Sequence, residues 1–341
     1  MPLQNYSVLK GRPINNRLAT GASPHYQVLV SQNGTLHRIA INVRSQDGSE
    51  VEFLVRSRFQ HPITEQLQDL PEGLHVVPSR PGGLALDFIR GNLMQPWELK
   101  PLPISAAGPD NDLNEKIDAY VQRAMADEDA WIYAFGETWG PEEDKADKYF
   151  GFRPGRGIHD IHMNQGNPPG KFAKDNGPYQ DGGLIFQFPA QRQWVGVFLK
   201  FQTQAWHSDD TEANPGVAGD APVDGDAIPP FDTPDGLVRI IAALVNDTAS
   251  PEREWVTLLN TSDVAIDLTG WTIRDRLKNA MPLSGRLPPG ETLRCRVTAP
   301  VALSNRGGII SLLDQRGIKV HGVAYTREQV RQPGRTVPFQ G

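Results

Sequence analysis

The sequence predicts a mainly β protein in two parts, and three observations lead to this fold class. Glycine and proline are abundant, with 33 Gly and 29 Pro among 341 residues, as expected where turns separate many strands. Short runs of β-branched and apolar residues recur between these turns. One segment alone has the spacing of a long amphipathic helix. We therefore expect a β-rich N-terminal domain with one long helix, followed by a β-sandwich.

The first hundred residues are predicted to form successive strands joined by tight turns. Asn33-Gly34 and Asp47-Gly48 favour hairpin turns, because both residues of such pairs tolerate positive φ. In residues 36–43 apolar and more polar side chains alternate, which predicts a strand with one buried face. The predicted strands are Tyr26–Val30, Leu36–Val43, Val51–Val55, Leu74–Val77 and Leu84–Ile89.

The long helix is predicted over residues 113–126. Asp112 is expected to cap its N-terminus, with Glu115 completing a capping box. Its apolar side chains recur at helical spacing and form one stripe, composed of Leu113, Ile117, Tyr120, Val121 and Ala124. A strand over Trp131–Phe135 is expected to follow, ended by Gly136.

Residues 136–182 are predicted to be irregular, because Gly, Pro, Asp and Asn are frequent there. A loop of this length inside a compact domain indicates either a function or disorder, and its aromatic residues favour order. Two strong strands are expected next, at Leu184–Phe188 and Trp194–Phe201. One face of the second is apolar. Its other face, which bears Lys200, is predicted to be either solvated or the wall of a site.

Residues 208–236 are predicted to form an acidic linker. They contain eight Asp and Glu residues and no Lys or Arg, with Gly, Pro and Ala between them. Such a composition cannot bury a core, so we expect an extended, solvated tether. The expected division of the chain is therefore 1–207, 208–236 and 237–341.

The C-terminal part again consists of strands and turns, which predicts a β-sandwich of about 100 residues. The predicted strands are Leu237–Val245, Trp255–Asn260, Gly270–Arg274, Thr292–Val297, Ile309–Asp314 and Lys319–Tyr325.

Composition excludes several classes of function. The net charge of -6 argues against a general nucleic-acid-binding surface, which needs clustered Lys and Arg. Cys295 is the sole cysteine, so neither an intramolecular disulfide nor a cysteine-based zinc site can form. The N-terminus lacks the apolar core of a secretory signal, and no apolar run is long enough to span a membrane. We therefore expect a soluble, cytoplasmic protein, with export that needs no N-terminal signal left open.

The densest group of chemically active side chains lies in residues 157–167, with the sequence Gly-Ile-His-Asp-Ile-His-Met-Asn-Gln-Gly-Asn. In a tight turn, His159 and His162 can converge and supply two nitrogen ligands to a transition metal such as zinc or manganese. Asp160 is then a third ligand or orients an imidazole. Further ligands are expected near two strong strands, and the candidates are Asp181, His207 and Asp209. Such a site would activate water.

Two alternatives use the same segment without a metal. In the first, His159 or His162 is a nucleophile or general base with an Asp partner, while Asn164 and Lys200 bind an anionic oxygen. In the second, these short polar side chains hydrogen-bond the backbone of a long loop and serve structure alone. The remaining histidines stand alone in the sequence and are predicted to be structural or exposed: His25, His37, His61, His75 and His321.

Two parts of the chain resemble known families. Residues 1–210 resemble the YukJ-type bacterial domain of unknown function, through segments 6–11, 157–167, 181–186 and 201–209. Residues 237–341 resemble a lamin tail domain, an immunoglobulin-like β-sandwich. That resemblance rests on 254–260, 267–275, 287–291, 303–305, 307–308 and 310–314. The first resemblance implies no activity. The second implies an adhesion or targeting module, of a kind appended in bacteria to hydrolases, nucleases or surface proteins.

The favoured expectation is a metal-dependent hydrolase acting on a phosphoester, with the C-terminal sandwich as a targeting or interaction module. Its catalytic residues are expected among His159, Asp160, His162, Asn164, Lys200 and His207. The alternative is a non-enzymatic binding or adhesion protein in which the His/Asp/Asn loop is structural. A protein or surface partner for the sandwich fits either alternative.

Overall fold

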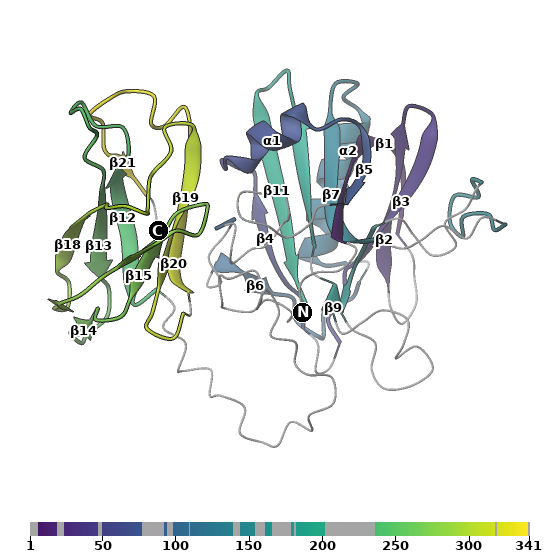
Figure 1. Ribbon diagram of the computed structural model, residues 1–341. Coiled ribbons are helices and arrows are strands. Elements are labelled where there is room, and N and C mark those ends of the chain that lie inside the picture. The colour runs from purple at the N-terminus through teal and green to yellow at the C-terminus, as the bar shows by residue number, and fades with distance from the viewer. Residues whose placement is uncertain are drawn as a thin grey trace.

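Two β-rich bodies make up the molecule, which Figure 1 shows side by side. Their cores are separate: two hydrophobic clusters contain residues up to Phe201, and a third contains residues from Val238 onward. The mainly β fold expected from the sequence is thus confirmed. The computed structural model describes residues 6–18, 24–46, 50–76, 92–93, 98–108, 110–138, 144–153, 161–165, 179–180, 182–201, 236–317 and 319–339. Apart from Gly236, the expected linker 208–236 lies outside these residues.

The N-terminal domain is organised around an 11-stranded sheet with the order β5-β1-β2-β3-β8-β7-β10-β11-β4-β6, and β9 pairs with β8. β1 also pairs with β7, so β1, β2, β3, β8 and β7 form a closed circuit of strands. Among the described strands, β3 and β8 form the one parallel pair. The bounds are β1 Tyr6–Leu18, β2 His25–Gln32, β3 Thr35–Asn42, β4 Glu52–Arg56, β5 Gly73–Val76, β6 Lys100–Pro101, β7 Trp131–Thr138, β8 Ile161–Gln165, β9 Tyr179–Gln180, β10 Gly182–Phe188 and β11 Gln193–Lys200.

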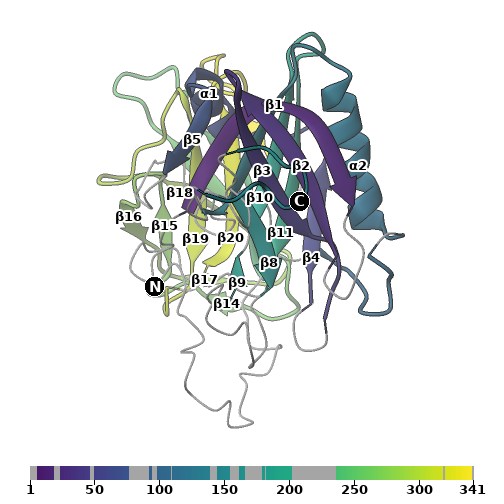
Figure 2. The same cartoon turned by 90° about the vertical axis from the view of Figure 1, so that its right-hand side faces the viewer.

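One face of this sheet packs against the long helix α2, Asp112–Met125, which contacts β1 and β10. Figure 2 shows α2 lying along that side of the domain. The expected apolar stripe is confirmed, since Leu113, Ile117, Val121 and Ala124 are buried in the main core. The expected cap at Asp112 is wrong. Asn111 caps the helix instead, its Oδ1 accepting the Asn114 N–H at 2.9 Å, because the first helical turn begins one residue earlier.

The other face of β7, β10 and β11 packs against the short helix α1, Ile63–Asp69. Ile63 and Leu67 of α1 join a second cluster with Phe198, while Trp194 packs at its margin. The face of β11 opposite the main core is therefore largely covered by apolar side chains. In the described part of β11, this face is neither solvated nor the wall of an open site, contrary to the prediction from the sequence.

The expectation of an irregular segment over 136–182 is confirmed for residues 144–153, which form a loop, and is wrong for the strands that the structure describes in the rest of the segment. β7 extends to Thr138, and β8 and β9 lie within the segment. Isolated five- and two-residue strands give too short an alternation to be recognised, and both depend on neighbours distant in sequence. β1 was not predicted either, because its pairing register shifts between Pro13 and Asn15 and interrupts the pattern. The predicted strand Leu84–Ile89 lies outside the described residues.

The C-terminal body is a sandwich of two four-stranded sheets, β18-β13-β12-β21 and β16-β15-β19-β20, with a small β14–β17 pair. Its core includes Trp271, Leu258 and Ile310, and the buried Cys295 thiol, whose pKa burial raises to about 11. The expected sandwich is confirmed. The bounds are β12 Val238–Leu244, β13 Trp255–Asn260, β14 Ile266–Asp267, β15 Thr272–Arg274, β16 Ala280–Pro282, β17 Arg286–Leu287, β18 Thr292–Arg296, β19 Gly307–Leu313, β20 Lys319–Thr326 and β21 Val337–Pro338.

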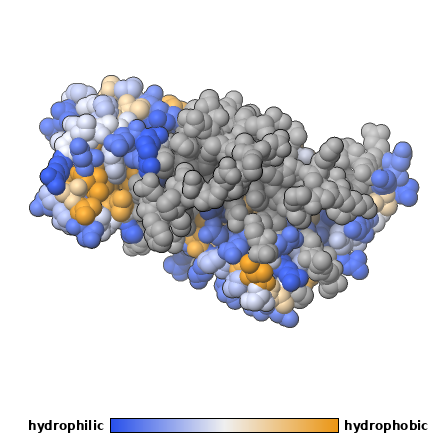
Figure 3. Space-filling view, turned by 90° about the horizontal axis from the view of Figure 1, so that it is seen from below, coloured by the Kyte–Doolittle hydropathy of each residue, from blue (hydrophilic) through white to orange (hydrophobic). Residues whose placement is uncertain are grey.

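Large apolar side chains are sparse on the described surface. Among the residues that Figure 3 colours, most are hydrophilic, and a hydrophobic area lies on each body. Scattered exposed apolar residues are normal for a folded protein. In the described chain, neither helix is long and apolar enough to cross a membrane. The exposed large apolar residues are Ile14, Val76, Ile104, Leu237, Val264 and Leu277.

Asn92 joins the two bodies. Its backbone has a φ of 52° and its side chain is buried against the sandwich. Its Nδ2 donates to the carbonyls of Ile310 at 2.9 Å and Val323 at 3.0 Å, and Ser311 Oγ donates to its Oδ1 at 3.3 Å. Gly322 makes room for it, because a Cβ there would lie 2.1 Å from Asn92 Oδ1. The next residue, Leu93, belongs to the cluster under α1, so this short segment connects both cores.

Asn92→Gly should weaken the attachment of the sandwich to the N-terminal domain. It should not strain the backbone, because glycine tolerates positive φ. The loss of buried hydrogen bonds should cost about 1–3 kcal/mol in the free energy of unfolding, measured by chemical denaturation. Asn305→Gly is the control, because the exposed Asn305 bonds only the Glu252 carboxylate among the contacts described. Equal effects of the two substitutions would contradict the joining role of Asn92.

Glu254 is a half-buried carboxyl at one end of the sandwich. Both of its oxygens accept the Leu303 N–H, at 3.1 and 2.9 Å. Burial, opposed in part by that bond, raises the pKa of Glu254 from 4.5 to about 7, with smaller contributions from the Glu252 and Asp275 carboxylates. The folded protein therefore binds this proton more tightly than the unfolded chain does.

Glu254 should make the sandwich less stable at alkaline pH. Because its folded-state pKa is raised, its contribution is fully present below pH 4.5 and is lost as pH rises through about 7. The melting temperature should fall over this range, and Glu254→Gln should reduce the fall. The exposed Glu291→Gln provides the control for a change of one charge. A wild-type pH profile identical to that of Glu254→Gln would contradict the prediction.

Candidate functional site

A row of polar side chains crosses one face of β2, β3 and β8. We call it the polar row, and it comprises His25, Gln27, Arg38, Asn42, His162 and Asn164. All are buried except His25, which is partly exposed. The opposite face of the same strands contributes to the main hydrophobic core. The expectation of a single buried face for residues 36–43 is therefore wrong, because β3 is covered on both sides.

His25 and His162 meet above β3. His25 lies opposite Asn42 on one side of β3, and His162 lies opposite Ala40 on the other. The small Ala40 side chain leaves room for the two rings to approach. Their Nε2 atoms are 3.1 Å apart, with ring centroids 5.2 Å apart and ring planes at 25°. The centroids are much farther apart than the nitrogens, so the rings meet edge to edge. A hydrogen bond between them requires an N–H on one ring and a lone pair on the other.

An amide pair lies beside the histidines. Asn42 Nδ2 donates to Asn164 Oδ1 at 2.7 Å, and Asn42 Oδ1 accepts the Arg44 N–H at 2.9 Å. The contact follows from the parallel register, which places Ala40 beside His162 and so brings the next residues on that face together. This end of the row thus combines two imidazoles and two amides, groups that donate to or accept from a polar ligand.

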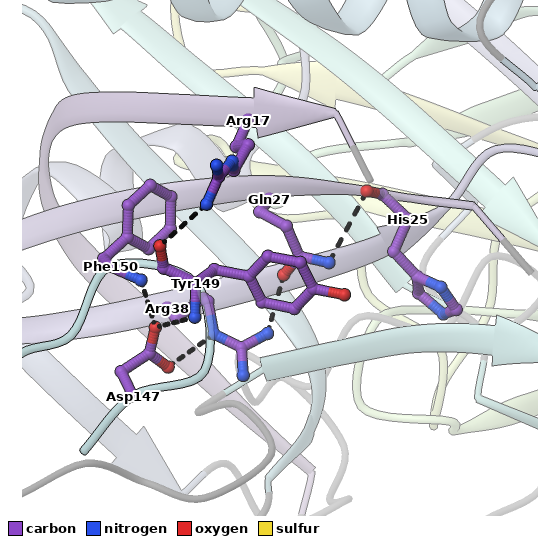
Figure 4. Close-up of polar contacts among 7 residues, drawn as sticks. All are labelled: Arg17, His25, Gln27, Arg38, Asp147, Tyr149 and Phe150. Carbon is purple, nitrogen blue, oxygen red and sulfur yellow. Dashed lines mark hydrogen bonds and ion pairs between the residues drawn. The ribbon is translucent and has the colours of Figure 1, made fainter. Parts of the chain in front are cut away.

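Arg38 anchors the other end of the polar row, as Figure 4 shows. Its Nε donates to Asp147 Oδ2 at 2.6 Å and its Nη1 donates to Gln27 Oε1 at 2.6 Å. The Tyr149 ring lies over the guanidinium, 4.8 Å from its Cζ. Both charged side chains are almost fully buried, so their mutual pairing offsets a large desolvation cost.

Asp147 also shapes the loop of residues 144–153. Its Oδ1 accepts the N–H groups of Tyr149 at 2.9 Å and Phe150 at 2.8 Å, and its backbone N–H donates to Phe152 O. Arg17 of β1 donates to Tyr149 O at 3.2 Å. One carboxylate therefore folds the loop and fastens it to Arg38, which holds it against the polar row (Figure 4).

The structure brings together some of the residues expected to form a site. His162 and Asn164 lie on β8, in the polar row. Lys200 does not join them. It donates to Glu52 at 2.7 Å, and its strand β11 is separated from β8 by β7 and β10, or roughly 14 Å across the sheet. The remaining expected site residues lie outside the described part of the chain: His159, Asp160, Asp181, His207 and Asp209.

Sequence reasoning missed several members of this site. His25 was expected to be structural or exposed, yet it contacts His162. The Asn33-Gly34 turn fixes the β2–β3 register, so the shared face of His25, Gln27, Arg38 and Asn42 could have been inferred from alternation. No sequence signal indicates that β8 pairs beside β3, or that Asp147 reaches Arg38.

The His25–His162 pair also has a spacing that suits a metal ion. Two nitrogen ligands of a tetrahedral zinc, each about 2.0–2.1 Å from the ion, lie about 3.3 Å apart. The observed separation is 3.1 Å. Within the described residues, no group of three His, Cys, Asp or Glu side chains surrounds a common point. The expected metal centre therefore stays a prediction.

Asp147→Ala should strongly destabilise the N-terminal domain, because it leaves the buried Arg38 charge without its partner. We expect a loss of about 3–5 kcal/mol in the free energy of unfolding, measured by chemical denaturation. Glu328→Ala is the control, since it removes an exposed ion pair with Arg331 and should change stability by less than about 1 kcal/mol. Comparable losses in both variants would refute an anchoring role for Arg38 and Asp147.

Comparisons with known proteins match the part of the chain that contains the polar row. Residues 1–213 match the family model described as "Uncharacterized conserved protein (DUF2278)". The chain is 44% identical over 214 residues to "Uncharacterized protein YukJ" of Bacillus subtilis (strain 168), a match covering 62% of this chain and 93% of that protein. The matched part contains β1 to β11 and the whole polar row, whereas the sandwich lies beyond it. The chain thus belongs to the DUF2278 family.

Proposed function

We propose that this protein is a metal-dependent hydrolase whose centre is the His25–His162 pair, with a phosphoester as substrate. The observation that carries the proposal is the 3.1 Å separation of the two Nε2 atoms on adjoining strands. Two imidazoles held at this distance can share either a proton or a divalent transition metal such as zinc or manganese. Both arrangements equip a site to activate water.

His25 and His162 would supply two ligands. Further ligands are proposed from the sequence candidates His159, Asp181, His207 and Asp209. A bound metal lowers the pKa of a coordinated water, which supplies a nucleophile at neutral pH. Asn42 and Asn164 flank the pair and would orient a polar substrate through their amide groups. An ester with anionic oxygens suits metal and amide donors together.

The C-terminal sandwich is proposed to act as a targeting or interaction module. The resemblance of residues 237–341 to a lamin tail domain supports this role, and Asn92 provides its attachment to the N-terminal domain. The alternative function is that of a non-enzymatic binding or adhesion protein. The ion pair and amide pair of the polar row favour it, since they hold strands and a loop in place.

The first test is elemental analysis of the full chain together with three variants. We expect about one equivalent of zinc or manganese in the wild type and its loss in His25→Ala and His162→Ala. His75→Ala is the matched control, because His75 lies on β5 and its Nε2 contacts Pro71 O. Hydrolysis of bis(p-nitrophenyl) phosphate should follow the metal content.

Ala40→Leu provides a variant that keeps both histidines. A larger side chain beneath the rings should push the Nε2 atoms apart and lower both metal content and hydrolysis. If neither the wild type nor any variant contains metal, and none hydrolyses the phosphoester, the hydrolase proposal is wrong and the binding alternative is favoured. Circular dichroism spectra matching the wild type would show that loss of metal is not loss of fold.

A further inference from the structure

The outer edge strand of the sandwich carries two exposed arginines at alternate positions. β18 ends the sheet β18-β13-β12-β21, and Figure 1 shows it on the side away from the N-terminal domain. Cys295 points into the core, while Arg294 and Arg296 are exposed on the opposite face. They lie opposite Thr257 and Trp255 of β13. We call β18 with these two arginines the arginine edge.

The charge of the sandwich differs from that of the rest of the chain. Residues 236–341 contain fourteen Lys and Arg against nine Asp and Glu, a net charge of +5, while the whole chain carries -6. The remaining 235 residues therefore carry -11. On the face of the arginine edge, the outward residues of β18 and their β13 partners include no carboxylate. The edge is thus a local cationic surface on an acidic protein.

The backbone of β18 has one paired side. It pairs with β13 through residues 292–296, and among the described strands none pairs with its other side. An edge strand with unpaired N–H and C=O groups is a template for an added strand from another chain. Side chains on an added strand alternate between faces, so every second residue would lie beside Arg294 and Arg296.

Charge decides which chain can occupy this edge. A second copy pairing through β18 would bring arginines against arginines, which is unfavourable for cross-strand neighbours. Stacking of a nucleic-acid base on Trp255 is obstructed, because the Arg294 guanidinium lies over that ring at 4.5 Å. An extended peptide with acidic residues at alternate positions satisfies both the backbone edge and the two arginines.

We propose that β18 is a docking edge for an extended acidic segment of a partner protein, which adds to the sheet as a further strand. The binding is independent of the polar row, because the two lie on different bodies. Strand addition at β18 would make the sandwich a peptide-recognition module. Two charge pairs at the surface contribute specificity and salt dependence, while backbone hydrogen bonds hold the strand.

The experiment measures binding of a fluorescein-labelled peptide of alternating Thr and Glu to the full-length protein by fluorescence anisotropy. Arg294→Glu/Arg296→Glu should weaken binding at least about tenfold, since two attractive pairs become repulsive. Arg327→Glu/Arg335→Glu is the matched control, because it changes the net charge equally at exposed positions elsewhere on the sandwich, and it should keep wild-type affinity. A peptide of alternating Thr and Lys should not bind.

Backbone amide exchange separates strand addition from charge attraction. Saturating acidic peptide should slow exchange at residues 292–296, as expected when an edge gains a partner. Binding without this protection would overturn the strand model. Equal loss of binding in both arginine double variants would also overturn it, because attraction would then follow total charge. A single-stranded oligothymidylate that binds as tightly as the acidic peptide would assign the edge to nucleic acid instead.

Discussion

The buried pairing of Arg38 with Asp147 is the interaction on which the N-terminal domain most depends. Arg38 lies on β3, one strand of the closed circuit, and its charge is almost wholly removed from water. A charge in that position requires a partner, and Asp147 supplies one from a loop more than 100 residues away. The same carboxylate folds that loop by accepting two of its N–H groups. This pair therefore joins the sheet to the loop, and Arg17 of β1 adds a hydrogen bond to Tyr149 O.

The polar row follows from this arrangement of strands. β8 inserts between β3 and β7, and its parallel pairing with β3 brings His162 above Ala40 and Asn164 beside Asn42. The antiparallel β2–β3 hairpin brings His25 from the other side. Two imidazoles separated by more than 130 residues in the chain thus come within hydrogen-bond distance. The histidine pair and the amide pair occupy the same short stretch of sheet, which explains why loss of fold must be measured separately from loss of any proposed function.

The two bodies divide the proposed roles. The family match covers the part that contains the polar row, so chemistry proposed there concerns the family domain. The sandwich adds a basic surface, and Asn92 fixes it to the domain by buried hydrogen bonds. In such an arrangement the arginine edge faces away from the interface (Figure 1), and a docked partner would not compete with the contact between the bodies.

The sequence by itself determined the mainly β class, the apolar face of α2 and most strands of the sandwich, because these depend on local alternation and helical spacing. It also singled out His162 and Asn164. The tertiary structure decided which side chains lie beside these two residues. It added His25 and Asn42, placed Lys200 with Glu52 instead, and moved the α2 cap to Asn111. Pairing between distant strands and the covering of β3 on both faces are long-range properties. No local pattern encodes which strand lies beside which, so these contacts could be read only from the fold.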